Sequence, residues 1–262
     1  MARICPLFSS SGGNSFYISS SGNSLLVDAG MNAKQLEIAI ESIGESAEKI
    51  KALLITHEHS DHISAVRVFA SRYNIPVYAS EGTLKGMESI FDCSKLNLNE
   101  ISFDGFEAAG MKVVPFHTSH DSRESNGYRI ETPDSRSIAV ATDMGYVSED
   151  VRRALLGCDA VLLESNHDLG MLRCSSYPYH VKRRIMSGVG HLSNDSCAEF
   201  ARELVENGTT RLILGHLSRE NNDPLLAYQT TKSVLEMMGA VEGRDYILKV
   251  AKPVNDERAI TL

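Results

Sequence analysis

The sequence predicts an α/β protein in which two β-rich halves pack sheet against sheet, with helices on the outside. Short apolar runs bounded by Gly, Ser and Asn alternate with helical patterns along all 262 residues. The two halves also echo each other, because SLLVDAG and KALLITHEH in the first half correspond to SIAVATDMG and DAVLLESNHD in the second. No linker or low-complexity segment divides the chain, so we expect residues 1–262 to form a single domain.

The first half is expected to open with a hairpin and to continue with alternating helices and strands. SFYIS and SLLVDAG form the hairpin, joined through SSGN. A helix follows, with apolar residues at Leu36, Ile40 and Ile43. Asn32 caps its start and Gly44 closes its end. KALLIT is then a buried strand, and DHISAVRVFASRY is a second helix.

The second half begins with several short strands over residues 96–116, with turns at FDG and AAG. GYRIET and RSIAVAT flank PDS as another hairpin. DAVLLES and TRLILGH are further buried strands, separated by helices near 178–188 and 194–207. Strand ends that carry Asp or His recur in both halves, so these polar side chains are expected to converge along one edge.

Composition restricts the class of protein. The chain has 42% hydrophobic residues, which is enough for a sizeable core. Five scattered cysteines without a CxxC argue against a disulfide framework and against a thiolate zinc site. The N-terminal segment has no secretory pattern and no apolar run approaches the roughly 20 residues of a membrane helix, so we expect a cytoplasmic protein. A net charge of −8 argues against nucleic-acid binding unless metals neutralise some of the acids and the cations are concentrated locally.

The stretch THEHSDH, at residues 56–62, follows a buried strand and is the strongest functional signal. His57 and His59 are two apart, so on extended backbone they point to the same side. Asp61 and His62 fall where a helix begins and can turn towards a second point. Nitrogen and oxygen ligands in two subsets suit two divalent cations in one pocket. The alternative is a polar loop with helix-capping residues.

The motif H-x-H-x-D-H resembles that of the metallo-β-lactamase superfamily, which implies a four-layer αββα sandwich with metals at one sheet edge. FHTSHDS, ATDMG and LILGHLS follow in the order of that family. Zinc and manganese both suit imidazole and carboxylate ligands, so the resemblance implies two Zn(II) or Mn(II) ions. It assigns His57, His59 and His120 to the first metal, Asp61, His62 and His216 to the second, and Asp143 as the bridge.

Several nearby residues have alternative roles. His117 and His120 lie in the same loop, and the family pattern fits His120 better, which leaves His117 to face the pocket from behind the ligands. Asp28, in VDAG, is expected to support the metal loop rather than bind metal. Glu58 lies between ligands and should point away. Redox members of the superfamily carry glutamate at the position of His59, so the histidine favours hydrolysis.

Substrate information comes from the segment between Asp143 and His216. Here Tyr177 and Tyr179 are interleaved with cations, a pattern that suits the bases and phosphates of a nucleic-acid strand. A solvated helix face is the alternative. The expected DNA contacts are Arg173, Lys182, Arg183 and Arg184.

LESNHD, YPYHVKRRIMS, GHLSND and GHLSRENN together resemble the YycJ-type (WalJ-type) branch of the superfamily. That resemblance implies a 5′-to-3′ DNA exonuclease in which a hydroxide between the metals is the nucleophile. Asp61 and His191 are the expected catalytic residues, with His191 a general acid or a phosphate contact. A helix-capping role is the alternative for His191. His167 is expected either behind the metal ligands or on the phosphate side of the site.

Two other functions remain compatible with the sequence. One is a small-molecule hydrolase of the same fold, such as a glyoxalase-II-like thioesterase or a cyclic phosphodiesterase. The other is a metal-holding binding protein without turnover. The basic aromatic segment favours the nuclease, and the glycine-rich SSGGNS loop could add backbone N–H groups for a phosphate.

Overall fold

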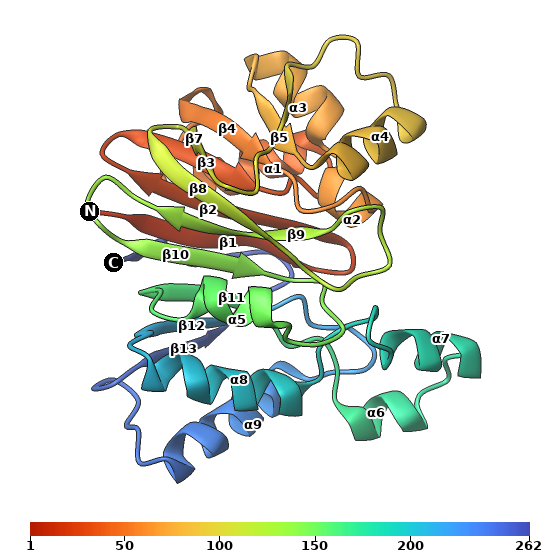
Figure 1. The fold of residues 1–262 in the computed structure, drawn as a ribbon, viewed down its shortest axis with the longest axis vertical. Coiled ribbons are helices and arrows are strands. Elements are labelled where there is room, and N and C mark those ends of the chain that lie inside the picture. Colours follow the sequence, from red (N-terminus) through yellow and green to blue (C-terminus); the bar gives the residue numbers. More distant parts are fainter.

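The computed structural model describes residues 1–262, and two seven-stranded mixed sheets face each other at its centre (Figure 1). In spatial order the first sheet contains β14 (Ile260–Thr261), β1 (Arg3–Ser10), β2 (Gly13–Ser20), β3 (Asn23–Val27), β4 (Ile50–Leu54), β5 (Val77–Ala79) and β6 (Leu98–Glu100). The second contains β13 (Ile247–Val250), β12 (Arg211–Gly215), β11 (Ala160–Glu164), β10 (Ser137–Ala141), β9 (Asn126–Glu131), β8 (Met111–His117) and β7 (Phe106–Ala108).

Helices cover the outer faces of both sheets, which gives four layers (Figure 1). The first sheet is covered by α1 (Ala33–Ser42), α3 (Val66–Tyr73) and α4 (Glu81–Ile90), and the second by α5 (Glu149–Leu155), α8 (Asn194–Glu206) and α9 (Pro224–Met237). Phe69 packs in the first outer core and Phe200 in the second. Phe16 and Tyr128 share the core between the sheets. The predicted αββα sandwich is therefore confirmed.

Each sheet changes from antiparallel to parallel pairing at an equivalent strand. In the first sheet β3 and β4 are parallel, and in the second β10, β11 and β12 are parallel. Ligand sites in such sheets form outside the carboxyl ends of parallel strands. Asp28 follows β3 and Asp143 follows β10, both with left-handed backbone (φ 63° and 57°). His216 follows β12 in the same conformation (φ 55°), so the echo in the sequence corresponds to matching strand ends.

The prediction of one helix over residues 61–73 is wrong in one respect. The structure has two helices there, α2 (Ser60–Ile63) and α3. The loop after β3 takes part in the break. The carbonyl of His62 accepts a hydrogen bond from the backbone N–H of Ala29 (2.8 Å), and the N–H of Ala65 donates to the carbonyl of Ala29 (2.9 Å). These long-range bonds replace helical ones. They also tie α2, which carries Asp61, to the loop after β3.

Two short helices project beside the edge where the parallel strands end, α6 (Leu169–Cys174) and α7 (Tyr179–Ile185) (Figure 1). The helix predicted near 178–188 corresponds to α7, which has no buried residue. Ser193 caps α8 by accepting from the N–H of Ser196 (3.2 Å). None of the helices combines the length and apolar character needed to cross a membrane.

Candidate metal centre

Three histidines converge on one point at the end of β4. His57 Nε2 lies 3.0 Å from His59 Nδ1, and His120 Nε2 lies 3.3 Å from that same His59 atom. His57 and His120 are buried, and His59 is half-buried. His120 comes from the loop after β8, so residues far apart in the sequence complete this group. This is the set predicted for a first metal.

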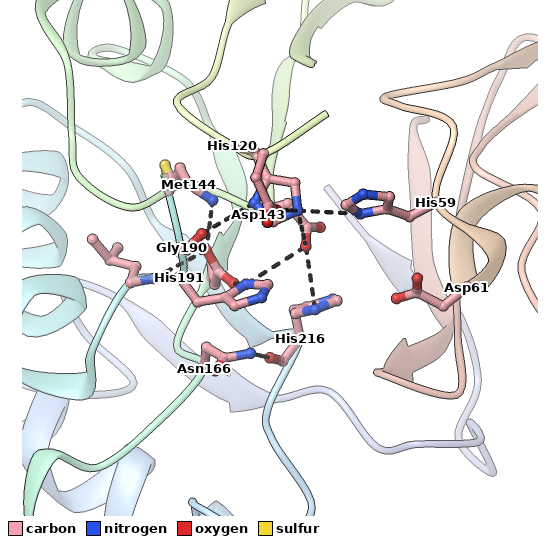
Figure 2. Close-up of polar contacts among 12 residues, drawn as sticks. His59, Asp61, His120, Asp143, Met144, Asn166, Gly190, His191 and His216 are labelled. Carbon is pink, nitrogen blue, oxygen red and sulfur yellow. Dashed lines mark hydrogen bonds and ion pairs between the residues drawn. The ribbon is translucent and has the colours of Figure 1, made fainter. Parts of the chain in front are cut away.

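A second group lies beside the first, with Asp143 between them (Figure 2). Asp61, His62 and His216 offer one ligand atom each within 4.8 Å of one another. Asp143 Oδ2 lies 3.2 Å from His62 Nε2, and Oδ1 lies 3.3 Å from His216 Nε2. The same Oδ1 is 3.7 Å from His120 Nε2. The structure thus brings together all seven residues predicted as metal ligands.

The Nδ1 atoms of three histidines already have hydrogen-bond partners outside the cluster. These contacts determine which ring nitrogen faces the centre. A neutral imidazole has one N–H and one lone pair, so an Nδ1 that donates outward leaves the Nε2 lone pair free. The outward contacts are His62 Nδ1 to Asp28 Oδ2 (2.7 Å), His216 Nδ1 to Asn14 Oδ1 (3.1 Å) and His120 Nδ1 to the carbonyl of Gly190 (3.1 Å). In their neutral forms, the three rings therefore direct lone pairs at the Asp143 carboxylate.

Lone pairs facing a buried carboxylate repel each other unless a cation lies between them, and this arrangement suits divalent metal ions. Asp143 Oδ2 is buried and has no hydrogen-bond partner. Burial would raise the pKa of Asp143, but His216 and His62 hold it well below its usual range. Two ligands at about 2.1 Å from a tetrahedral metal lie roughly 3.4 Å apart, close to the observed nitrogen–oxygen spacings.

The pKa values of His62 and His57 shift in opposite directions. Burial lowers the pKa of His62, but the carboxylates around it, led by that of Asp28, outweigh burial and raise it well above the usual range. Burial and the nearby His62 lower the pKa of His57 well below its usual range, so His57 is neutral, the form that binds metal.

Asp28 and Glu58 both take positions outside the cluster. Asp28 accepts hydrogen bonds from the N–H of Thr56 (2.8 Å) and from its hydroxyl (2.9 Å), and its third contact is His62. Its carboxylate therefore supports the loop, as the sequence predicted. Glu58 points away, also as predicted, because it accepts from the N–H of Arg123 (2.9 Å).

His117 does not face the pocket, so that prediction is wrong. Its side chain is exposed and its ring stacks on Phe103, with 4.1 Å between the ring centroids. His117 ends β8 and its ring lies against Phe103, whereas His120 lies in the loop beyond the strand and reaches His59.

Glu164 is a buried carboxylate of the site that the sequence analysis missed. It ends β11, and its Oε1 lies 2.7 Å from His191 Nδ1. Its Oε2 accepts from the N–H groups of Met144 (2.8 Å) and Leu192 (3.2 Å). Burial lowers the pKa of His191, but Glu164 outweighs burial and raises it to about 9. The sequence did offer a signal for Glu164. It is an acidic residue at the end of an apolar strand, and that strand lies between the strands that lead to Asp143 and His216.

The N-terminal SSGGNS turn contributes a side chain to the centre, which the sequence analysis also missed. Asn14 Nδ2 lies 3.0 Å from Asp61 Oδ2, while Asn14 Oδ1 receives the contact from His216. On the other side of this turn, Arg219 Nη2 donates to Ser10 Oγ (3.4 Å). The turn therefore links two members of the second group.

The four cationic side chains predicted to contact DNA fall into two pairs, one with partners inside the protein and one without. Lys182 Nζ donates to the carbonyls of Arg173 (2.8 Å) and Ser175 (2.7 Å), and the guanidinium of Arg184 forms a two-point ion pair with Asp121 (Nη2 to Oδ1, 2.9 Å). The side chains of Arg173 and Arg183 are exposed and pair with no carboxylate. Of the four side chains, only those of Arg173 and Arg183 have no partner within the protein.

His167 is buried, and only 1% of it is exposed. Neither ring nitrogen has a hydrogen-bond partner, and burial lowers its pKa to about 4. The neighbouring Asn166 donates to the carbonyl of His216 (2.9 Å) and so helps hold that loop (Figure 2). The ring of His167 thus has no surface for the predicted contact with substrate, because it lies inside the protein.

Comparison with known proteins identifies relatives along nearly the whole chain. Residues 23–217 match the family described as Beta-lactamase superfamily domain. Exodeoxyribonuclease WalJ of Streptococcus pneumoniae is 38% identical over 246 residues, which cover 92% of this chain and 90% of that protein. Exodeoxyribonuclease YycJ of Bacillus anthracis is 36% identical over 249 residues, 94% of each chain.

Solved structures with the same fold are more distant in sequence. Zinc-bound PqqB from Methylobacterium extorquens superposes with a TM-score of 0.75 over 100% of both chains at 18% identity. The short form of human tRNase Z superposes with a TM-score of 0.68 at 17% identity, over 100% of this chain and 99% of that one.

Proposed function

The chain belongs to the metallo-β-lactamase superfamily, and from this membership and the geometry of its site we propose that it is a two-metal DNA exonuclease. The observation that carries the proposal is the buried Asp143 carboxylate, which faces imidazole nitrogens from both halves of the chain. Relatives named exodeoxyribonucleases that match more than nine-tenths of this chain support DNA as the substrate.

We infer two divalent ions, Zn(II) or Mn(II), because both suit imidazole and carboxylate ligands. When bound, they would activate a water molecule and offset the charge of the scissile phosphate. Asp61 would bind metal and help orient the attacking water. The proposed ligands are His57, His59 and His120 for one ion, Asp61, His62 and His216 for the other, and Asp143 for both.

His191 is the proposed proton donor to the leaving oxygen. Its Nδ1 lies 3.6 Å from Asp143 Oδ1, so the ring stands at the edge of the centre. Glu164 is completely buried and holds Nδ1, so Nε2 is the ring nitrogen that remains for proton transfer. We assign Glu164 the part of a positioning residue, because its contacts reach the substrate only through His191.

Arg173 and Arg183 are the proposed contacts to the phosphates of the strand. They are exposed on α6 and α7, which project beside the site (Figure 1). Phosphate contacts by such cations orient a strand without reading its sequence. Lys182 and Arg184 would act indirectly, because their contacts hold the segment in place.

The test is digestion of end-labelled single-stranded and double-stranded DNA with a panel of divalent metals. A 5′ label should be released as mononucleotide early if the direction is 5′ to 3′, as we propose, whereas a 3′ label should remain on shortening fragments. Asp143→Asn is the matched control, because asparagine tolerates the same left-handed backbone and removes only the charge. A purified protein that hydrolyses thioesters or small phosphodiesters but leaves DNA intact would overturn the proposal.

A further inference from the structure

A tyrosine stands exposed beside the centre and has no role in the chemistry above. Tyr146 follows Asp143 by three residues, and 52% of it is accessible to solvent. Aromatic side chains bury most of their surface in folded proteins, so an open ring next to a catalytic centre needs an explanation.

The loop that carries Tyr146 is fixed to the other loops of the centre. Gly145 N–H donates to the carbonyl of Ser119 (2.8 Å), and Ser119 Oγ donates to the carbonyl of Gly188. A Cβ on Gly145 would lie 2.3 Å from the carbonyl carbon of Gly188, so only glycine allows this close approach. The backbone segment that carries Tyr146 therefore also positions the loops of His120 and His191.

The loop that borders the ring carries exposed apolar side chains. Gly188 has no side chain, and a Cβ there would lie 3.8 Å from Tyr146 Cδ1, so the glycine leaves the edge of the ring uncovered. Met186 and Val189, in the same loop as Gly188, are 39% and 47% exposed. The nearby carboxylate of Asp121 is neutralised by Arg184. Uncharged aromatic surface beside an anion-binding centre suits a ligand that combines a phosphate with a flat base.

We propose that Tyr146 is a stacking site for a nucleobase of the DNA strand whose phosphate occupies the metal centre. This rests on the proposed function and adds how the enzyme holds the nucleotide next to the cut. Stacking accepts every base, because each has a π-face, so the site binds without reading sequence. The ring rather than the hydroxyl carries the interaction.

The first experiment compares Tyr146→Ala and Tyr146→Phe on two single strands, one with bases and one made of abasic sugar-phosphate. Tyr146→Ala should weaken binding to the strand with bases by roughly 5- to 150-fold, the range expected for one base–aromatic stack. It should leave binding to the abasic strand unchanged, and Tyr146→Phe should behave as wild type on both. Equal losses on the two strands, or no loss on either, would overturn the stacking site.

A second experiment uses the absence of tryptophan from the chain. Tyr146→Trp introduces a single fluorophore, whose emission should be quenched by the strand with bases and not by the abasic strand. Met237→Trp is the matched control, because that residue is 87% exposed at the end of α9, a helix on the outer face of the second sheet. Quenching equal to the control would count against the site. Wild-type protein that degrades no DNA would remove the proposed function and the stacking site together, whereas normal degradation without quenching would remove only the stacking site.

Discussion

The Nδ1 atom of His191 lies 2.7 Å from Oε1 of Glu164, and that glutamate is completely buried at the end of a central strand. The other carboxylate oxygen accepts a hydrogen bond from the backbone of Met144, the residue after Asp143. One side chain thus fixes both the ring of His191 and the loop of the residue proposed to bridge the metals. The orientation of the imidazole should depend on Glu164.

We expect His191→Ala to lower the rate of DNA cleavage by roughly 10²–10⁴, the usual contribution of a positioned proton donor. Glu164→Gln should lower the rate less, because the amide keeps the shape of the contact and removes the charge. Both variants should bind metal as wild type does, measured by elemental analysis. Loss of metal from His191→Ala would instead make that residue a ligand, and an unchanged rate would return it to a capping role.

Asp28 should control metal affinity without touching metal. Asp28→Ala removes the partner of His62 Nδ1 and both contacts to Thr56, so metal should bind about 10- to 100-fold more weakly, as for other residues that orient ligands. Asp28→Asn tolerates the left-handed backbone (φ 63°) and should lose less. Competition with a fluorescent chelator measures both. Equal affinity in the alanine variant would show that His62 is oriented by other contacts.

The two histidines of the FHTSHDS loop should differ sharply. His120→Ala removes a buried imidazole that faces His59 and Asp143, so it should abolish activity and lower the metal content. His117→Ala removes only an exposed ring stacked on Phe103 and should leave both nearly unchanged. Metal analysis and DNA digestion on matched preparations decide between them. The reverse order would mean that the loop rearranges when metal binds.

The first four ligands were predictable from local spacing, whereas His120, Asp143 and His216 were assigned through the resemblance to the superfamily. Four ligands lie within the six residues from His57 to His62, and Asp143 and His216 follow apolar strands whose ends meet. The function of Glu164 was not predictable in this way, because an acid at a strand end acquires its role only from the loop opposite it.

The cationic side chains near α7 illustrate a second limit of prediction from the sequence. Sequence identifies Arg184 as a positive charge, but its partner Asp121 is 63 residues away, and only the fold brings them together. The break between α2 and α3 has the same origin, because the bonds that replace the helix come from Ala29. Patterns within a segment therefore predicted its type, whereas contacts between distant segments decided which side chains remained free.

The cysteines should be dispensable for metal binding. No cysteine belongs to the ligand groups, and burial raises the pKa of Cys5 and Cys197 to about 12 and that of Cys158 to about 11. Iodoacetamide at pH 8 should therefore label the exposed Cys174 first and spare those three, since thiolates are the reactive form. Mass spectrometry locates the label, and elemental analysis should still find two metals per chain. Loss of metal on labelling would contradict a site made of nitrogen and oxygen ligands.

The last prediction concerns the exposed arginines and tests the substrate class. Binding to single-stranded DNA should weaken steeply with salt, because each neutralised phosphate releases counterions. Replacing Arg173 and Arg183 together with glutamine should reduce the slope of log affinity against log salt by about 1.4, at about 0.7 per contact. The loss should be the same for every sequence, because such contacts do not read bases.

Arg184→Gln is the informative comparison, since that guanidinium is paired with Asp121 beside His120. It should leave the salt slope nearly unchanged and should affect the rate through the position of the His120 loop. Hydrolysis of bis-p-nitrophenyl phosphate should survive the double substitution, because small phosphodiesters need the centre and not the strand contacts. A net charge of −8 makes the measurement discriminating, since no overall attraction can imitate a local patch. Salt-insensitive binding by the wild-type protein would exclude these arginines as phosphate contacts and would favour a small-molecule substrate.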